Sequence, residues 1–209
     1  RAVEGKILRM TTAGAAPADN PLAGSLIWTT GHRNVQGLAH GPGGRVFYSE
    51  HGPNNDDEFG IVRKGRNYGW PTVHGFCDDV VEDAFCLDSN VVQPLSAYTP
   101  TLAVAGIEWY DADAFPALKG RILMTSLKAG QLRALRAHPS KDSLLSDSIL
   151  VNNRWGRLRD VLVRANGNIV VAVSNRDGRG SAGAVDDRLI ELAPLQDPTR
   201  ASRRAEAAT

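Results

Sequence analysis

Residues 31–79 read GHRNVQGLAHGPGGRVFYSEHGPNNDDEFGIVRKGRNYGWPTVHGFCDD, and they hold most of the features that decide how this chain folds. They contain a polar Gly-His-Arg-Asn cluster at 31–34, a strand-like run at 45–50, a Gly-Pro turn at 52–53 and three carboxylates at 56–58. Arginine and asparagine can clamp planar acidic groups. Main-chain carbonyls at a turn beside carboxylates are hard oxygen ligands of the kind that calcium takes. The stretch therefore predicts an anion-binding site next to a hard-cation site.

The length of 209 residues suits one domain or part of a larger one. Hydrophobic residues make up 42% and charged residues 22%, which is typical of a globular protein, and the net charge of +1 gives no argument for a nucleic-acid or membrane-surface partner. No apolar run approaches the ~18–20 residues that span a bilayer. The first residues, RAVEG, do not form a signal peptide. The chain starts in what looks like mid-domain, so we expect a signal or an N-terminal half to lie outside it.

The chain has two cysteines, Cys77 and Cys86, on either side of an acidic stretch. No histidine or third cysteine stands at zinc-finger spacing around them. A disulfide between them would close a short loop, stabilise it by roughly 2–3 kcal/mol, and imply an oxidising compartment. The alternative is a pair of reduced, half-buried thiols, and the sequence leaves both interpretations open.

Short alternating runs separated by Gly, Pro and Asn turns predict β-strands along most of the chain, and no long stretch has a helical period. The expected strands are 5–10, 25–30, 35–40, 45–49, a short run from 61, 103–110, 121–125, 131–136, 158–163, 169–173 and 188–192. The pair Asn166-Gly167 predicts a hairpin turn. Residues 11–24 and the acidic, aperiodic residues 77–96 are expected to be loops, the second of them an insertion.

Many short strands with such turns indicate an all-β sandwich, barrel or propeller. Residues 35–50 and 158–175 share an order of strand, Gly-containing polar turn and strand, which favours a propeller. We therefore predict a partial β-propeller over residues 1–195, followed by a flexible C-terminal tail at 196–209.

The segments GHRNVQGLAH, SEHGPNNDDE and GRNYGWPTVHG together resemble the soluble glucose/sorbosone dehydrogenase family, which are PQQ-dependent aldose sugar dehydrogenases. PTLAVAGIEWY, FPALKGRILMTSLKAGQLRALR and GRLRDVLVRANGNIVVAVSNRDG follow in the family's order, so the resemblance covers about residues 5–194. It implies a six-bladed β-propeller with PQQ on its top face. This chain would supply the C-terminal half or a little more of that propeller, and the missing part would be N-terminal.

The resemblance also implies which residues bind PQQ. The set is Arg33, Asn34, Thr101, Lys128, Arg157 and Arg159. Arg33 is also the implied catalytic residue, because its guanidinium can stabilise the negative charge that develops on a quinone oxygen. Arg157 and Arg159 alternate on a predicted strand and would point the same way, and with Lys128 they suit the three carboxylates of PQQ. The alternative interpretation is a solvated basic strand face.

Two calcium sites are implied in the same way. Gly52 and Pro53 match the residues whose main-chain carbonyls hold the calcium that polarises the quinone. The implied ligands of a second calcium are Glu58, Asp78 and the carbonyls of Tyr68, His74 and Phe76. One further acidic ligand of the family has no position that can be placed on this chain. The alternatives are an ordinary turn and a solvated acidic loop.

The implied reaction is oxidation of an aldose at C1 to the lactone by hydride transfer to PQQ, with calcium and an external electron acceptor, in the periplasm or outside the cell. The family's general base is a histidine of the N-terminal half, and none of the five histidines here matches its motif; His32 and His51 are expected to shape the pocket floor. We therefore expect this chain alone to be inactive, with the missing blades on another chain or absent.

The alternative function is a non-catalytic propeller module that binds a protein or glycan. The retained Lys128, Arg157 and Arg159 favour the dehydrogenase.

Overall fold

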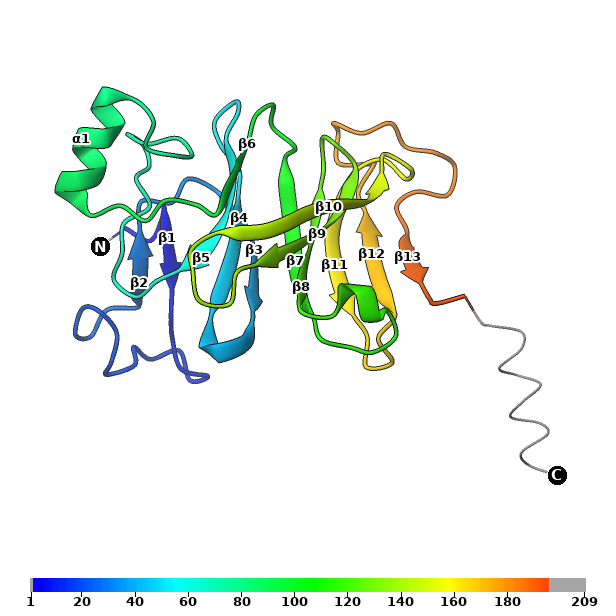
Figure 1. The fold of residues 1–209 in the computed structure, drawn as a ribbon, viewed down its shortest axis with the longest axis horizontal. Helices are drawn as coiled ribbons and strands as arrows, with labels where there is room; N and C mark the ends of the chain where they lie inside the picture. Colours follow the sequence, from blue (N-terminus) through cyan, green and yellow to red (C-terminus); the bar gives the residue numbers. More distant parts are fainter. Residues whose placement is uncertain (1, 196–209) are drawn as a thin grey trace.

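The computed structural model describes residues 2–195 and places four antiparallel sheets side by side (Figure 1). The first sheet contains β1 (Lys6–Leu8) and β2 (Ile27–Thr30). The second contains β3 (Val35–His40), β4 (Val46–Glu50), β5 (Asp57–Val62) and β6 (Ser96–Tyr98). The third contains β7 (Val104–Tyr110), β8 (Arg121–Ser126), β9 (Gln131–Ala137) and β10 (Leu144–Asn152). The fourth contains β11 (Leu158–Val163), β12 (Ile169–Val173) and β13 (Leu189–Leu192).

Within each sheet, every strand pairs with the next strand of the chain, so the sheets are simple meanders. The first strands of the three larger sheets lie against one another, with β7 packed between β3 and β11. The segments that enter these three strands therefore meet at one edge of the molecule, which is the upper edge in Figure 1. The structure confirms the mainly β architecture and most of the expected strands.

The core lies between sheet faces. Ile122 and Met124 of β8 belong to a cluster shared with the second sheet, whereas Leu123 between them belongs to a cluster shared with the fourth. All three side chains have no exposed surface. Because successive strand residues point to opposite faces, β8 buries both of its faces. The third sheet is therefore packed between the second and fourth sheets. This packing fixes the edge of the molecule at which the loops of the three sheets meet.

The predicted hairpin at Asn166-Gly167 is confirmed between β11 and β12. Gly167 has a φ of +83°, and a Cβ there would lie 2.7 Å from the Cβ of Ala114, so only glycine fits. The Gly167 carbonyl accepts the hydroxyl hydrogen of the buried Tyr110 at 2.9 Å. The turn is thereby held against the end of β7.

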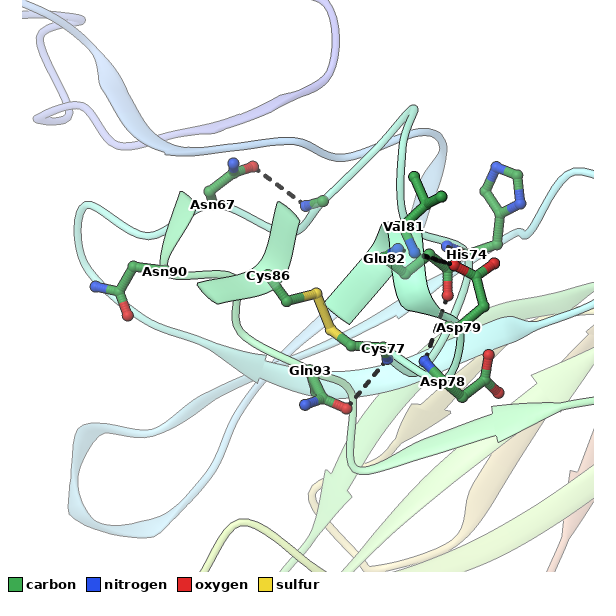
Figure 2. Close-up of a disulfide and its surroundings, with 12 residues drawn as sticks. Asn67, His74, Cys77, Asp78, Asp79, Val81, Glu82, Cys86, Asn90 and Gln93 are labelled. Carbon is green, nitrogen blue, oxygen red and sulfur yellow. Dashed lines mark hydrogen bonds between the residues drawn. A yellow bond between two sulfur atoms is a disulfide. The ribbon is translucent and has the colours of Figure 1, made fainter. Parts of the chain in front are cut away.

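The expectation of a loop over residues 77–96 is wrong, because helix α1 (Val80–Ser89) lies within it (Figure 2). The Asp79 carboxylate caps the helix by accepting the main-chain N–H groups of Val81 and Glu82 at 2.8 and 2.9 Å. Cys77 and Cys86 form a disulfide that joins the helix to the preceding loop. The sequence pattern missed the helix because several of its apolar residues face solvent, with Val80 86% and Leu87 84% exposed, while Glu82 is buried.

Two further strands were not expected. β10 mixes exposed apolar and polar residues without alternation, and the paired guanidinium and carboxylate of Arg133 and Asp147 (both contacts 2.9 Å) tie it to β9. β6 is three residues long and pairs with β5. The interpretation of Asp57 and Glu58 as part of a solvated acidic loop is also wrong, because both lie in β5. The predicted flexible tail at 196–209 lies outside the described residues.

Replacement of a core leucine tests the packing of the sheets. Leu135 lies opposite Ile122 and is fully buried, so Leu135→Ala should lower the free energy of unfolding by about 2–5 kcal/mol through lost burial and a cavity. Leu145→Ala on the adjacent strand, where the side chain is 53% exposed, should cost less than about 1 kcal/mol. Urea denaturation followed by circular dichroism measures both. Equal losses in the two variants would contradict the burial of Leu135.

Candidate functional site

A cleft of about 830 Å³ opens at the edge where the sheets' entering segments meet. Eight residues predicted from the resemblance line it, six for the cofactor and two for its calcium ion. They are Arg33, Asn34, Gly52, Pro53, Thr101, Lys128, Arg157 and Arg159. These residues come from segments far apart in the sequence, and the packing of the second, third and fourth sheets brings them together. His51 also lines the cleft, as expected, whereas His32 is buried and lies outside its lining.

The cleft is strongly cationic. It is lined by Arg33, Lys128, Arg157, Arg159 and also Arg179, which the sequence analysis had not selected. The only carboxylates in its lining, among the residues described, are Asp57 and Asp177. A surplus of guanidinium and ammonium groups in one concave site suits a ligand with several negative charges.

Arg157 and Arg159 point together, as their alternation predicted. Asp177 bridges them, because its Oδ2 accepts Arg157 Nε at 2.8 Å and an Arg159 terminal nitrogen at 2.9 Å. The hydrogen bond from Arg157 lowers the pKa of Asp177 below its usual value. Asp177 and Arg179 lie in the run NRDGRG, residues 175–180, the first part of which belongs to the last stretch that resembles the family. The bridge holds two like charges side by side in the wall of the cleft.

Arg33 and Lys128 present their charges differently. The Arg33 guanidinium donates to the His51 carbonyl at 3.2 Å and lies over the Trp70 ring at 5.3 Å, so its direction is constrained. Lys128 is exposed, and its main-chain N–H donates to the Leu102 carbonyl at 3.0 Å. Within residues 2–195 its ammonium group makes no hydrogen bond or ion pair. Lys128 is therefore free to bind an anion.

Asp57 ties two segments of the cleft wall, the turn at Gly52 and residues 101–103, to the start of β5. Its carboxylate, 1% exposed, accepts the Gly52 N–H at 3.1 Å, the Thr101 hydroxyl at 2.7 Å and the Ala103 N–H at 2.6 Å. The hydroxyl hydrogen of Thr101 is therefore committed inside the protein. Its oxygen already accepts the Ala103 N–H at 3.2 Å and can only accept from a ligand. A Cβ on Gly52 would lie 1.8 Å from the Asn55 carbonyl, so this turn requires glycine. The sequence had identified Asp57 only as one of three neighbouring carboxylates.

The residues predicted to bind a second calcium do not all lie in one place. Glu58, Tyr68 and His74 line a small pocket beside the cleft, together with Gly52 and Pro53, but Phe76 and Asp78 are exposed and lie outside its lining. The Glu58 carboxylate accepts the Tyr48 hydroxyl at 2.8 Å and the Gly75 N–H at 3.1 Å. Burial and the nearby Glu50 charge raise the pKa of Glu58 to about 8.

The surroundings of Asp78 belong to the helix rather than to this pocket. Its main-chain N–H points to the buried Glu82 carboxylate at 3.5 Å, and the His74 N–H donates to the same carboxylate at 3.0 Å (Figure 2). Among residues 2–195, no three His, Cys, Asp or Glu side chains are grouped so as to hold a metal ion. Main-chain carbonyls would therefore have to supply much of any calcium site.

A family model described as glucose / sorbosone dehydrogenase matches residues 1–185. The chain belongs to this family. It is 30% identical over 188 residues to an aldose sugar dehydrogenase of Escherichia coli, covering 84% of the chain and 50% of the relative. It is 29% identical over 231 residues to quinoprotein glucose dehydrogenase B of Acinetobacter calcoaceticus, covering 83% and 48%.

The fold is similar to that of the PQQ-bound aldose sugar dehydrogenase of Streptomyces coelicolor, with a TM-score of 0.78 and 31% identity, over 92% of this chain and 53% of that one. The chain therefore spans about half the length of the curated relatives it matches. It is part of an oxidoreductase family that acts on sugars.

Removal of the Asp57 carboxylate should loosen the cleft wall. Asp57→Ala leaves the Gly52 N–H and the Thr101 hydroxyl without their acceptor and the Ala103 N–H with only the Thr101 oxygen at 3.2 Å, so the free energy of unfolding should fall by about 2 kcal/mol. The control Asp142→Ala removes only an exposed ion pair with Arg63 and should cost less than about 1 kcal/mol. Thermal and urea unfolding measure both. An Asp57 variant as stable as the control would show that its contacts do not hold the loops.

Proposed function

We propose that the protein containing this chain oxidises aldose sugars at C1 to lactones by hydride transfer to PQQ, with calcium. One observation carries the proposal: the six residues predicted to bind the cofactor, drawn from separate segments, line a single cationic cleft. Family membership supports the sugar substrate. The same cleft speaks against a non-catalytic module, because such a module has no use for clustered arginines in a concave site.

The donor set fits PQQ. When bound, PQQ would accept the hydride of the sugar C1–H. Arg157, Arg159 and Lys128 would bind its carboxylates, and Asp177 would keep the two guanidinium groups oriented for that task. Arg33, aimed by the His51 carbonyl and Trp70, would donate to the oxygen that becomes negative as hydride arrives. Asn34 and the Thr101 oxygen would add polar contacts in the same cleft.

The Gly52-Pro53 turn fits a calcium ion through its main-chain carbonyls, which are hard oxygen ligands. Asp57 anchors this turn from inside, so the carbonyls would be held ready for a cation. Calcium bound there would act as a Lewis acid on the cofactor. The second calcium, with Glu58, Asp78 and the carbonyls of Tyr68, His74 and Phe76, remains a prediction.

We further propose that the general base and the remaining blades of a six-bladed propeller come from an N-terminal part, on the same or another chain. His51 is poorly suited to serve as the base. Its Nε2 lies 2.6 Å from the Val104 carbonyl, which can only accept, so this nitrogen carries a hydrogen. An external acceptor would take the electrons onward.

The disulfide between Cys77 and Cys86 supports an oxidising location, in the periplasm or outside the cell. No helix among residues 2–195 is long and apolar enough to cross a membrane.

The arginine pair tests the cofactor site. In the intact protein, Arg157→Ala and Arg159→Ala should each weaken PQQ binding by about 2–3 kcal/mol, the scale of a lost charge-assisted hydrogen bond. Arg164→Ala is the control, because Arg164 makes an exposed pair with Glu191 and does not line the cleft. Calorimetric titration with PQQ gives the affinities. Unchanged binding after replacement of both arginines would refute the cofactor site.

Calcium removal tests the metal. Treatment of the intact protein with EDTA should abolish dye-linked aldose oxidation, and added calcium should restore it, because calcium at Gly52-Pro53 would supply Lewis-acid polarisation of the cofactor. Calorimetry of the EDTA-treated protein should show heat on calcium addition, together with a rise in melting temperature. Absence of both the heat and the shift would rule out calcium at Gly52-Pro53 and at the second set of ligands.

The 209-residue chain alone should show no aldose oxidation with added PQQ and calcium.

A further inference from the structure

Glu50 is a buried carboxylate whose hydrogen bonds all go to one short segment. It is the last residue of β4 and 4% exposed. Its Oε1 accepts the main-chain N–H groups of Arg33 and Asn34, the latter at 3.0 Å. Its Oε2 lies 2.8 Å from His32 Nδ1. Three consecutive residues are therefore bound by a single side chain from a neighbouring strand.

His32 completes this arrangement from behind. It is 2% exposed, stacks on the Tyr68 ring at 4.3 Å between centroids, and lies edge-on to Tyr48 at 5.6 Å. Its Nε2 is 2.9 Å from the Thr29 hydroxyl. With Nδ1–H donating to Glu50, the ring holds the carboxylate in one place, and both groups have the partners that burial requires.

The segment held in this way has little other freedom. Gly31, immediately before it, has a φ of +76°, and a Cβ there would lie 2.0 Å from Asn67 Oδ1. Beyond the main chain, the Asn34 amide oxygen accepts from Gln36 at 2.9 Å. The side chains of Arg33 and Asn34 then line the cleft. Glu50 lines the small pocket beside the cleft but is absent from the lining of the cleft itself, so it reaches a ligand in the cleft through these two residues.

We propose that Glu50 is a positioning residue, whose carboxylate fixes the main chain of Arg33 and Asn34 and so aims both side chains at the ligand in the cleft. The proposal rests on the proposed function for the identity of that ligand, PQQ. A different buried carboxylate, Glu82, accepts the N–H groups of His74 and Asp78 in the same manner but lies outside the cleft lining. It provides a matched control for effects of buried carboxylates in general.

Two substitutions separate geometry from charge. Glu50→Gln keeps the length of the side chain: its amide oxygen can accept both main-chain N–H groups. Its NH₂ can donate to His32 Nδ1 if the ring hydrogen moves to Nε2, where the Thr29 oxygen accepts it. Glu50→Asp keeps the charge but is one methylene shorter, so it cannot reach Arg33 and Asn34. Positioning therefore predicts that glutamine works and aspartate fails.

The first measurement needs no cofactor. In the PQQ-free intact protein, amide hydrogen exchange at Arg33 and Asn34 should be at least about tenfold faster in Glu50→Asp than in the wild type. Exchange in Glu50→Gln should stay within about threefold. Glu82→Asp should accelerate exchange at His74 and Asp78 only.

The second measurement is the PQQ dissociation constant. It should rise about tenfold in Glu50→Asp, less than on removal of a whole arginine side chain, because the contacts of Arg33 and Asn34 are misaligned rather than lost, and it should stay within about threefold in Glu50→Gln and Glu82→Asp. Wild-type exchange or affinity in Glu50→Asp, or equal defects in Glu50→Gln and Glu50→Asp, would overturn the proposal.

If Glu50→Asp fails to fold, Glu50→Gln decides the question. Wild-type exchange and affinity in Glu50→Gln would support positioning, and a loss of affinity of about tenfold would overturn it. If the wild type does not bind PQQ, the proposed function fails, and the exchange rates alone decide the role of Glu50.

Discussion

Hydrogen bonds from loop N–H groups to buried carboxylates hold the cleft together. Asp57 and Glu50 lie at the start of β5 and the end of β4, where neighbouring strands place two acidic side chains at one edge of the second sheet. Each is nearly inaccessible to water, so each needs several donors, and loop amides supply them. Loops that carry ligand-binding groups are thereby fixed by the rigid strands beneath them.

Formation of the cleft also requires the sheets to pack against one another. Each strand pairs with its sequence neighbour, so local folding can form every sheet, but no single sheet contains the cleft. The cleft exists only where the second, third and fourth sheets pack face to face and bring Arg33, Lys128 and Arg157 to one edge. Its formation therefore depends on the two hydrophobic clusters on either side of β8.

The sequence predicted elements wherever burial follows strand alternation, as in β8 and at the Asn166-Gly167 hairpin. It failed for α1, whose buried position is occupied by Glu82 and whose valines face water, and for β10, which alternates poorly at an edge. The candidate residues came from the family resemblance, and the structure brought those of the cofactor together. The roles of Asp57, Glu50 and Asp177 could not be read in advance, because each depends on which atoms meet across segments distant in sequence.

The exposed residues of helix α1 contribute neither to the core nor to the cleft. Its own cap, its disulfide and Glu82 secure it, and residues such as Val80 and Leu87 add nothing to the two clusters of the core. Substitution of these exposed side chains therefore removes no contact within either cluster and none in the lining of the cleft. The exposed positions of the helix can therefore change, and new surface chemistry can arise there, without altering the cleft.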